Sequence, residues 1–262
     1  MYSHIVWLSD LSEQAKACLE PLRCMALMGP ARVTILYAGN EDSVESEASR
    51  QHVESLKTTL AKTEELQINL EMTVGSPTSA AGAYGASADL VVIGRTGASS
   101  REVLIGSTAE RVLRGTASSV LVVGGRPFED IQHVLCPIEV DRPATVPIVH
   151  AARIARTYDA TCTFLALMPF GNEQPAQSQL SNLQEAVHQA LEPSLRSELK
   201  ARYEVGYANE PSEGICEVAK EMDLVVMGSQ NRTGLARIFL GSVSERVASR
   251  APIPVLVARP LT

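Results

Sequence analysis

The stretch DLVVMGSQNRTGLARIFLGSVSERV at residues 223–247 decides the fold, because the chain carries a second version of it: residues 89–112 read DLVVIGRTGASSREVLIGSTAERV. Both stretches open with an aspartate and an unbroken apolar run, and both continue through a glycine-containing loop to G-S-x-x-E-R-V. A continuous apolar run of this length is typical of a parallel β-strand that is covered on both faces. We therefore expect the order strand, loop and helix in two places.

The repetition extends over almost the whole chain. Pro77 and Pro211 precede the two aspartates by the same distance, and both copies end in a valine-rich strand followed by Arg-Pro. A period of roughly 134 residues is that of a duplicated domain and not of a solenoid unit. We expect a first domain over residues 1–126 and a second over residues 131–262, joined near GGRPFEDIQ.

Apolar runs alternate with helix-type spacing in each copy, which predicts β-α-β units. In the first copy we expect strands at 4–9, 32–38, 68–75, 89–94 and 119–124, and helices at 12–28, 45–65, 77–86 and 107–114. In the second we expect strands at 133–139, 161–168, 201–208, 223–228 and 254–259, and helices at 143–158, 178–200, 212–221 and 242–249. This pattern predicts an α/β protein with two tandem doubly wound domains, each built on a five-stranded parallel sheet.

The composition argues against several classes of protein. The 262 residues carry a net charge of −7 with no basic block, so we expect no nucleic-acid partner. The start MYSHIVWLSD has neither a basic segment nor a long apolar run, and we expect a cytoplasmic protein without membrane attachment. The five cysteines form no C-x-x-C pair and the five histidines are scattered singly, which predicts buried free thiols and no metal site.

Acidic residues and glycine loops mark the ends of the strands where an open parallel sheet binds ligands. Asp10 closes the first strand of copy one, and Glu139 closes the first strand of copy two. A carboxylate there is suited to ribose hydroxyls or an amine. The glycine loops after the fourth strands are suited to phosphate, because their backbone N–H groups and the following helix dipole attract anions.

Other interpretations of the same residues need no ligand. Ser107–Glu110 and Ser242–Glu245 fit the S-x-x-E capping box of a helix start. Asp10 and Glu139 fit helix caps. Four loop arginines are either solvated or close to phosphates: Arg95, Arg101, Arg232 and Arg237. The loops match neither G-x-x-x-x-G-K-[ST] nor G-x-G-x-x-G.

The acid after the first strand, the V-V-x-G strand and the G-x2-G-x9-G-[ST] loop before E-R-V resemble the universal stress protein family. The resemblance covers almost the whole chain, as two tandem copies. It implies the strand order 3-2-1-4-5 in each domain and, as in many members, ATP or another adenine nucleotide in this crevice, with or without Mg2+. It also implies pairing of the last strands, which here are in one chain, and a homodimer is the further option. Other members lack the loop and bind no nucleotide.

The resemblance assigns nucleotide-binding roles to five residues in each copy. In copy one these are Asp10 for the adenosine part and Gly94, Gly97, Gly106 and Ser107 for the phosphates. In copy two they are Glu139, Gly228, Asn231, Gly241 and Ser242.

Each copy departs from the family pattern. Copy one has eight residues between Gly97 and Gly106, where the family has nine, while copy two keeps nine but has Asn231 in place of glycine. Asn tolerates positive φ better than other non-glycine residues, whereas a missing residue shifts every later amide of the loop, so we expect copy two to be the better binder. In the opposite direction, Glu139 is one methylene longer than Asp10 and leaves less room for the ribose. A second alignment, of Arg95-Thr96-Gly97 with Arg232-Thr233-Gly234, also fits.

Two functions follow from these observations. The first is a nucleotide-binding stress-response or signalling module without catalytic residues, since His4 and His133 lie at the opposite, amino ends of their strands. The second is an interaction module that has lost nucleotide binding and whose two domains form an intramolecular pseudo-dimer through residues 119–123 and 254–258. An enzyme of the wider adenine-nucleotide α-hydrolase-like group is disfavoured, because the chain contains neither S-G-G-x-D-S nor H-x-G-H.

Overall fold

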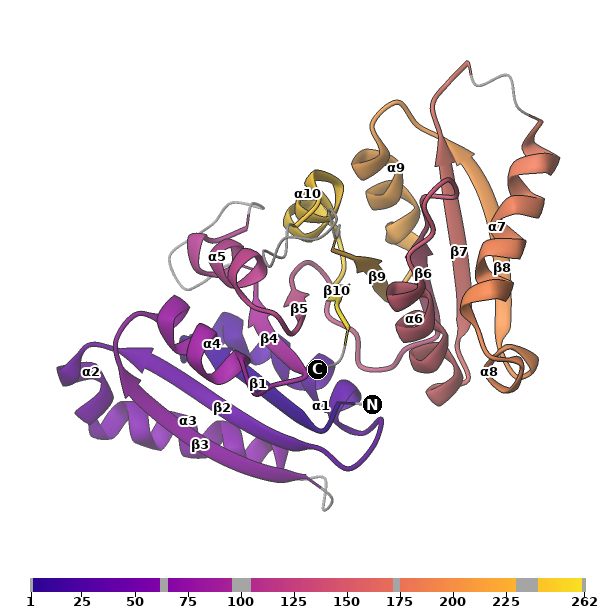
Figure 1. Ribbon diagram of the computed structural model, residues 1–262. Coiled ribbons are helices and arrows are strands. Elements are labelled where there is room, and N and C mark those ends of the chain that lie inside the picture. Colours follow the sequence, from indigo (N-terminus) through magenta and orange to yellow (C-terminus); the bar gives the residue numbers. More distant parts are fainter. Residues whose placement is uncertain (1, 62–65, 96–104, 172–174, 230–239, 261–262) are drawn as a thin grey trace.

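The strands of the described residues join one ten-stranded sheet in the computed structural model (Figure 1). The structure describes residues 2–61, 66–95, 105–171, 175–229 and 240–260. The strand order is β3-β2-β1-β4-β5-β10-β9-β6-β7-β8. If the strands are numbered within each repeat and read from the outer edge to the centre, both halves have the order 3-2-1-4-5, as the family resemblance implied. The strands within each half run parallel.

The first repeat alternates strands and helices along the chain. Its strands are β1 (His4–Ser9), β2 (Arg32–Gly39), β3 (Gln67–Val74), β4 (Leu90–Gly94) and β5 (Ser119–Val123). Its helices are the 3-10 helix η1 (Glu13–Cys18) and the α-helices α1 (Leu19–Ala26), α2 (Glu41–Glu45), α3 (Glu47–Leu60), α4 (Pro77–Gly85) and α5 (Ser107–Gly115).

The second repeat follows the same order. Its strands are β6 (His133–Pro137), β7 (Thr161–Met168), β8 (Lys200–Tyr207), β9 (Leu224–Gly228) and β10 (Val255–Ala258). Its helices are α6 (Thr145–Thr157), α7 (Ala176–Ala190), α8 (Pro193–Ser197), α9 (Pro211–Val218), the 3-10 turn η2 (Ala219–Glu221) and α10 (Ser242–Arg250).

The two halves meet where β5 and β10 pair antiparallel, with Leu121 opposite Leu256 at the centre of the register. Figure 1 shows these two strands in the middle of the molecule, with one repeat to either side. Both strands are buried along their whole length, so the junction continues the sheet without an exposed edge. The free edges are instead β3 and β8, where exposed and partly buried residues alternate.

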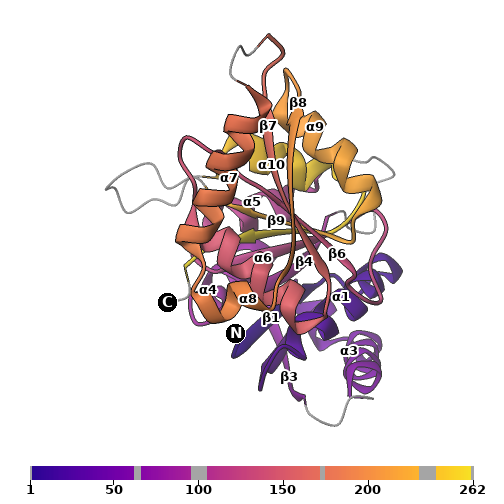
Figure 2. The same cartoon turned by 90° about the vertical axis from the view of Figure 1, so that its right-hand side faces the viewer.

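The core consists of two apolar layers, one on each face of the sheet. Ile5 and Trp7 of β1 face the layer that holds residues of α1, α3, α6 and α7. Val6 and Leu8 face the opposite layer, which holds residues of α4, α5, α9 and α10. Both layers contain residues of both repeats, so the two repeats share their core. Figure 2 shows helices on both sides of the sheet. This doubly covered sheet explains why the inner strands are apolar without alternation.

The aspartates that open the two quoted stretches hold the amino ends of the strands. Asp89 Oδ2 accepts hydrogen bonds from the N–H groups of Ser3 at 2.7 Å and His4 at 3.0 Å. Asp223 Oδ2 accepts from Gln132 N at 2.9 Å and His133 N at 2.8 Å in the second repeat. The repeated aspartate therefore ties the residue before strand four to the start of strand one.

Four expected helices differ from the structure, and the one expected at 212–221 is α9 followed by the 3-10 turn η2. The helix expected at 178–200 is two helices and the start of a strand, because Leu191 is extended and Pro193 begins α8. Proline suits the first turn of a helix, where no N–H donor is needed. The segment 12–28 is η1 followed by α1, and the segment 45–65 lies largely in α3, which Ser46 separates from α2.

The cysteines agree with the expectation of free thiols. All five are unpaired, and four of them are buried, with Cys216 half-buried.

Candidate functional site

The candidate site in each repeat lies where the carboxyl ends of strands one and four adjoin. β1 lies between β2 and β4, and β6 lies between β7 and β9. The chain leaves strand one towards one neighbour and strand four towards the other, so the winding reverses between these two strands. Open parallel sheets bind ligands at such a point, because the loops diverge and leave a crevice.

Asp10 follows β1 directly and forms a tight polar turn. Its Oδ1 accepts hydrogen bonds from Ser12 N at 3.0 Å and Ser12 Oγ at 2.6 Å. Ser12 in turn is the N-cap of η1, and its Oγ accepts from Ala15 N at 3.2 Å. Leu11 between them has a φ of 59°, a conformation that is unusual for a side chain with a Cβ. Asp10 therefore supports the helix cap and is not the cap itself.

Glu139 lies two residues beyond β6 and its side chain is exposed. Its carbonyl accepts from Arg142 N at 3.1 Å, in a turn that leads to α6. The N-cap of α6 is Ala144, so the expectation that Glu139 caps this helix is wrong.

In the second repeat, β6 and β9 separate before Glu139, at a point where the chain has Pro137. The register of β1 with β4 covers four residue pairs, from Ile5–Leu90 to Leu8–Ile93. That of β6 with β9 covers two, Val134–Leu224 and Leu135–Val225. Pro137, which stands where the first repeat has Leu8, has no N–H to donate to a neighbouring strand. Strands one and four consequently separate earlier in the second repeat.

The helices that follow the glycine loops begin at glycine. Gly106 is the N-cap of α5 and Gly241 the N-cap of α10, and neither end has a side-chain cap hydrogen bond. Ser107 and Ser242 are the first helical residues, and both are exposed. The S-x-x-E capping-box interpretation is therefore wrong, because a serine must stand at the N-cap position to accept from the third helical N–H. Within the described part of the chain, no side chain caps the first-turn N–H groups of either helix.

The loop in each repeat is held closed at its base, but by different contacts. In the first repeat, Gly106 N donates to Arg95 O at 2.7 Å, directly after Gly94. In the second, the buried Ser244 donates from Oγ to Gly228 O at 2.7 Å. The first repeat has Ala109 at the position of Ser244 and cannot form the second contact. No sequence motif predicts this role for Ser244.

Two predicted site residues, Gly97 and Asn231, lie outside the described residues. Arg101, Arg232 and Arg237 also lie outside the described residues. The structure therefore does not test which of the two loop alignments is correct. Of the ten predicted site residues, the structure places the other eight at the carboxyl ends of strands one and four or at the start of the following helix.

Arg95 does not face the crevice. Its side chain is 8% exposed, and its Nη1 donates to the carbonyl of Ala251, the C-cap of α10, at 2.6 Å. Burial lowers the pKa of the guanidinium, which nevertheless stays positively charged at neutral pH. A Cβ at Gly124 would lie 2.5 Å from Arg95 Nε, so glycine is needed there to make room. Neither expectation for this arginine, solvation or phosphate contact, is met.

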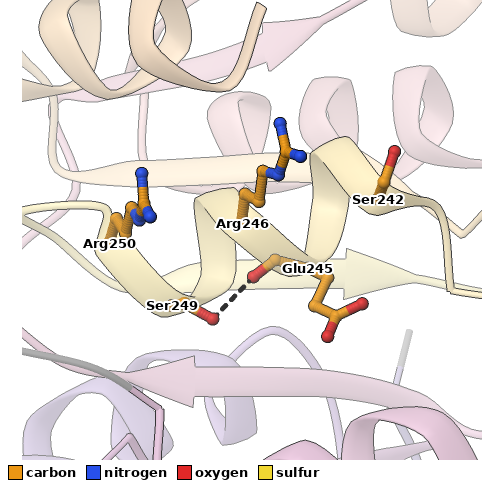
Figure 3. Close-up of a pocket in the computed structure, with 5 residues that line it drawn as sticks. All are labelled: Ser242, Glu245, Arg246, Ser249 and Arg250. Atoms are coloured by element: carbon orange, nitrogen blue, oxygen red, sulfur yellow. Dashed lines mark hydrogen bonds between the residues drawn. The ribbon is translucent and has the colours of Figure 1, made fainter.

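A shallow hollow of about 350 Å³ runs along the outer face of α10 (Figure 3). It begins at Ser242, one of the predicted site residues, and continues past Arg246 and Arg250. Figure 3 shows these three side chains pointing to the same side of the helix. Arg246 is paired with Glu210 at 2.8 Å, which offsets part of the positive charge.

The described residues contain no group of three or more His, Cys, Asp and Glu side chains arranged to hold a metal ion. Within the same residues, no helix is long and apolar enough to cross a membrane. His4 and His133 are the first residues of β1 and β6, at the amino edge of the sheet and away from both crevices.

Comparisons with known proteins give one consistent result. The model of the universal stress protein family matches residues 1–124 and again residues 130–259. A universal stress protein of Mycolicibacterium smegmatis is 28% identical over 243 residues, which cover 88% of this chain and 82% of that protein. The crystal structure of a universal stress protein from Archaeoglobus fulgidus covers 98% of both chains with a TM-score of 0.67 at 17% identity. A functionally unknown protein from Pseudomonas aeruginosa has a TM-score of 0.70 at 15% identity, over 99% of this chain and 93% of that one.

Proposed function

We propose that this chain, which belongs to the universal stress protein family as two tandem copies, binds an adenine nucleotide in the crevice between strands one and four. The proposed ligand is ATP, or another adenine nucleotide, with or without Mg2+. Binding would serve stress response or signalling by changing which surfaces the protein presents. No catalytic residue is proposed.

The main observation in support of this proposal is that both α5 and α10 have a glycine at the N-cap position. Among the described residues, no side chain caps the amino end of either helix, and both helices follow the carboxyl end of strand four. Such an end attracts phosphate, because the first-turn N–H groups have no intrahelical acceptor and the helix dipole is positive there. Asp10 and Glu139 stand at the end of the adjacent strand, where a carboxylate is suited to ribose hydroxyls.

The second crevice has features that favour binding. Glu139 and Asp10 are both exposed, but Asp10 Oδ1 already accepts two hydrogen bonds from Ser12. The ends of the loop are held without a ligand in both repeats, by Ser244 Oγ to Gly228 O in the second and by Gly106 N to Arg95 O in the first, so it is the retained loop length that favours the second. A loop whose ends are already held loses less conformational entropy on binding.

The alternative is an interaction module that binds no nucleotide. The observation that favours it is the β5–β10 junction, which already unites both repeats in one sheet and one core. In that case the crevices would be remnants, and the tandem pseudo-dimer would itself be the functional form.

Two measurements separate these functions. Mass spectrometry of small molecules released from natively purified protein should detect an adenine nucleotide. Isothermal titration with ATP should give binding that is lost in the double variant Gly106→Val/Gly241→Val, with Gly115→Ala as a matched control at a helical glycine that has open space for a Cβ. The absence of heat at near-millimolar ATP would refute nucleotide binding and leave the interaction module.

A further inference from the structure

Two buried arginines cross between the repeats and hold the far ends of the same two helices that begin at the crevices. Arg95, at the end of β4 in the first repeat, donates from Nη1 to Ala251 O at the carboxyl end of α10. Arg259, which follows β10 in the second repeat, donates from Nη2 to Leu113 O in the last turn of α5. Each helix is thus capped at its carboxyl end by an arginine of the other repeat.

Burial and local packing show that these contacts are built into the interface. Arg259 is 1% exposed, and its Nη1 also donates to Ser118 O at 2.6 Å. Burial lowers the pKa of its guanidinium to about 10, so the side chain is still charged at neutral pH. Arg95 lies in the space left by Gly124. A cation at this end of a helix is favourable, because the helix dipole is negative there.

Arg95 also touches its own crevice through its backbone. Its carbonyl accepts the N–H of Gly106 at 2.7 Å, the N-cap of α5. One residue therefore connects the start of α5 in the first repeat to the end of α10 in the second. Since α10 is a short rigid element of nine residues, a shift at its end is passed to its start at Gly241.

We propose that the two crevices are coupled through these arginines, so that occupation of one changes the affinity of the other. A ligand that moves the start of α5 would move Arg95 and with it the end of α10. In the reverse direction, a shift of the end of β10 would reach α5 through Arg259, which donates to Leu113 O. That the ligand is a nucleotide rests on the proposed function; the mechanical link between α5 and α10 does not.

Hydrogen–deuterium exchange tests the link without any ligand. The substitution Gly106→Val disturbs the start of α5, and the measured quantity is exchange in the last turn of α10. We expect exchange there to become about five-fold faster, at the lower end of typical coupling between sites. In an Arg95→Met background, Gly106→Val should add nothing to exchange in α10. Equal exchange in Gly106→Val and wild type, or an equal response with and without Arg95, would overturn the proposal.

Two further variants keep this test decisive. Arg114→Met is the control, because Arg114 also crosses between the repeats, to Glu245, but is half-exposed on the surface. It should leave the response of α10 to Gly106→Val unchanged. If Arg95→Met does not fold, Gly124→Ala takes its place in the test. This variant keeps the guanidinium of Arg95 but fills the space that the Arg95 side chain occupies. It too should abolish the response.

An experiment with ATP separates the coupling from the proposed function. In the Gly241→Val chain, which retains the first crevice, ATP should slow exchange in the last turn of α10, and Arg95→Met should remove that effect. A wild-type chain that gives no heat with ATP contradicts the proposed function, and the ligand-free exchange experiment then decides the coupling alone. A chain that binds ATP in the first crevice but shows no change in α10 contradicts the coupling.

Discussion

His150 of α6 is a buried histidine that takes part in the contact between the repeats. It is 5% exposed, and its Nδ1 lies 2.9 Å from the hydroxyl of Tyr2 at the start of the first repeat. Burial, together with the nearby Arg153, lowers the pKa of His150 to about 4. The folded protein therefore holds this imidazole neutral under conditions in which the unfolded chain would protonate it.

This histidine should make stability depend on pH. Between pH 6.5 and 4 the unfolded state binds a proton that the folded state does not, so the free energy of unfolding should fall as pH falls through this window. The loss should be about 2–3 kcal/mol at pH 4, which follows from the size of the pKa shift. Urea denaturation at pH 7 and at pH 4.5 measures it. His150→Gln keeps an acceptor for Tyr2 and should flatten the dependence; an unchanged slope in this variant would contradict the assignment.

Gly124 is a second residue whose role depends on the other repeat. A methyl group at this position would lie within 3 Å of Nε, Cζ and Cβ of Arg95. Gly124→Ala should therefore force Arg95 from Ala251 O and leave a buried charge without its partner. We expect a loss of about 2–4 kcal/mol in the free energy of unfolding, measured by chemical denaturation. Gly82→Ala is the control, because open space surrounds that glycine in α4, and it should not destabilise.

At the scale of elements, the two strand-loop-helix units have diverged while keeping their positions. β4 and β9 both end in glycine, and α5 and α10 both begin after a glycine N-cap. They differ in how the base of the loop is closed and in how early strand one separates from strand four. These differences predict unequal binding by the two crevices.

Gly241→Val should weaken ATP binding more than Gly106→Val. The second repeat keeps the family loop length, so it should contribute most of the affinity. We expect a loss of ten-fold or more for Gly241→Val, equivalent to about 1.4 kcal/mol, and a smaller change for Gly106→Val. Titration calorimetry of both variants measures this, and equal affinities would refute the ranking.

Ser244 should act by positioning the loop. Ser244→Ala restores the residue of the first repeat and removes the hydrogen bond to Gly228 O. We expect weaker ATP binding by the second crevice, with little change in the position of α10, because alanine suits a helix well. A Ser244→Ala chain that binds ATP as well as wild type would show that the contact is only structural.

At the scale of the molecule, the two repeats form one sheet with a shared core. β5 and β10 supply each other's only antiparallel partner within the described sheet, and both are buried. Separation of the repeats would expose the edge of β5, and an apolar strand edge readily pairs with another copy.

The isolated first repeat, residues 1–126, should therefore self-associate. Light scattering should show a mass that rises with concentration towards a dimer, whereas the full chain of 28.1 kDa should not associate through this edge. An isolated repeat that stays monomeric at high concentration would mean that β5 does not need a partner.

The sequence by itself determined the alternating elements, their duplication and the position of eight predicted site residues near the strand ends. Apolar periodicity and glycine positions are local signals, and the described strands match the expected ones to within about two residues. Local signals failed where two of them competed: helical spacing across 178–200 hid the break at Leu191, and S-x-x-E suggested caps where glycine holds the N-cap position.

Tertiary structure alone decided which side chains turn towards the other repeat. Arg95 was expected in a loop, near phosphate or solvent, but it lies under Gly124 and binds Ala251 O, 156 positions away in the chain. Arg259, Tyr2 and His150 likewise find their partners in the other repeat. Periodicity reports whether a residue is buried and says nothing about its partner, because a partner far along the chain is brought close only when β5 and β10 join the two sheets.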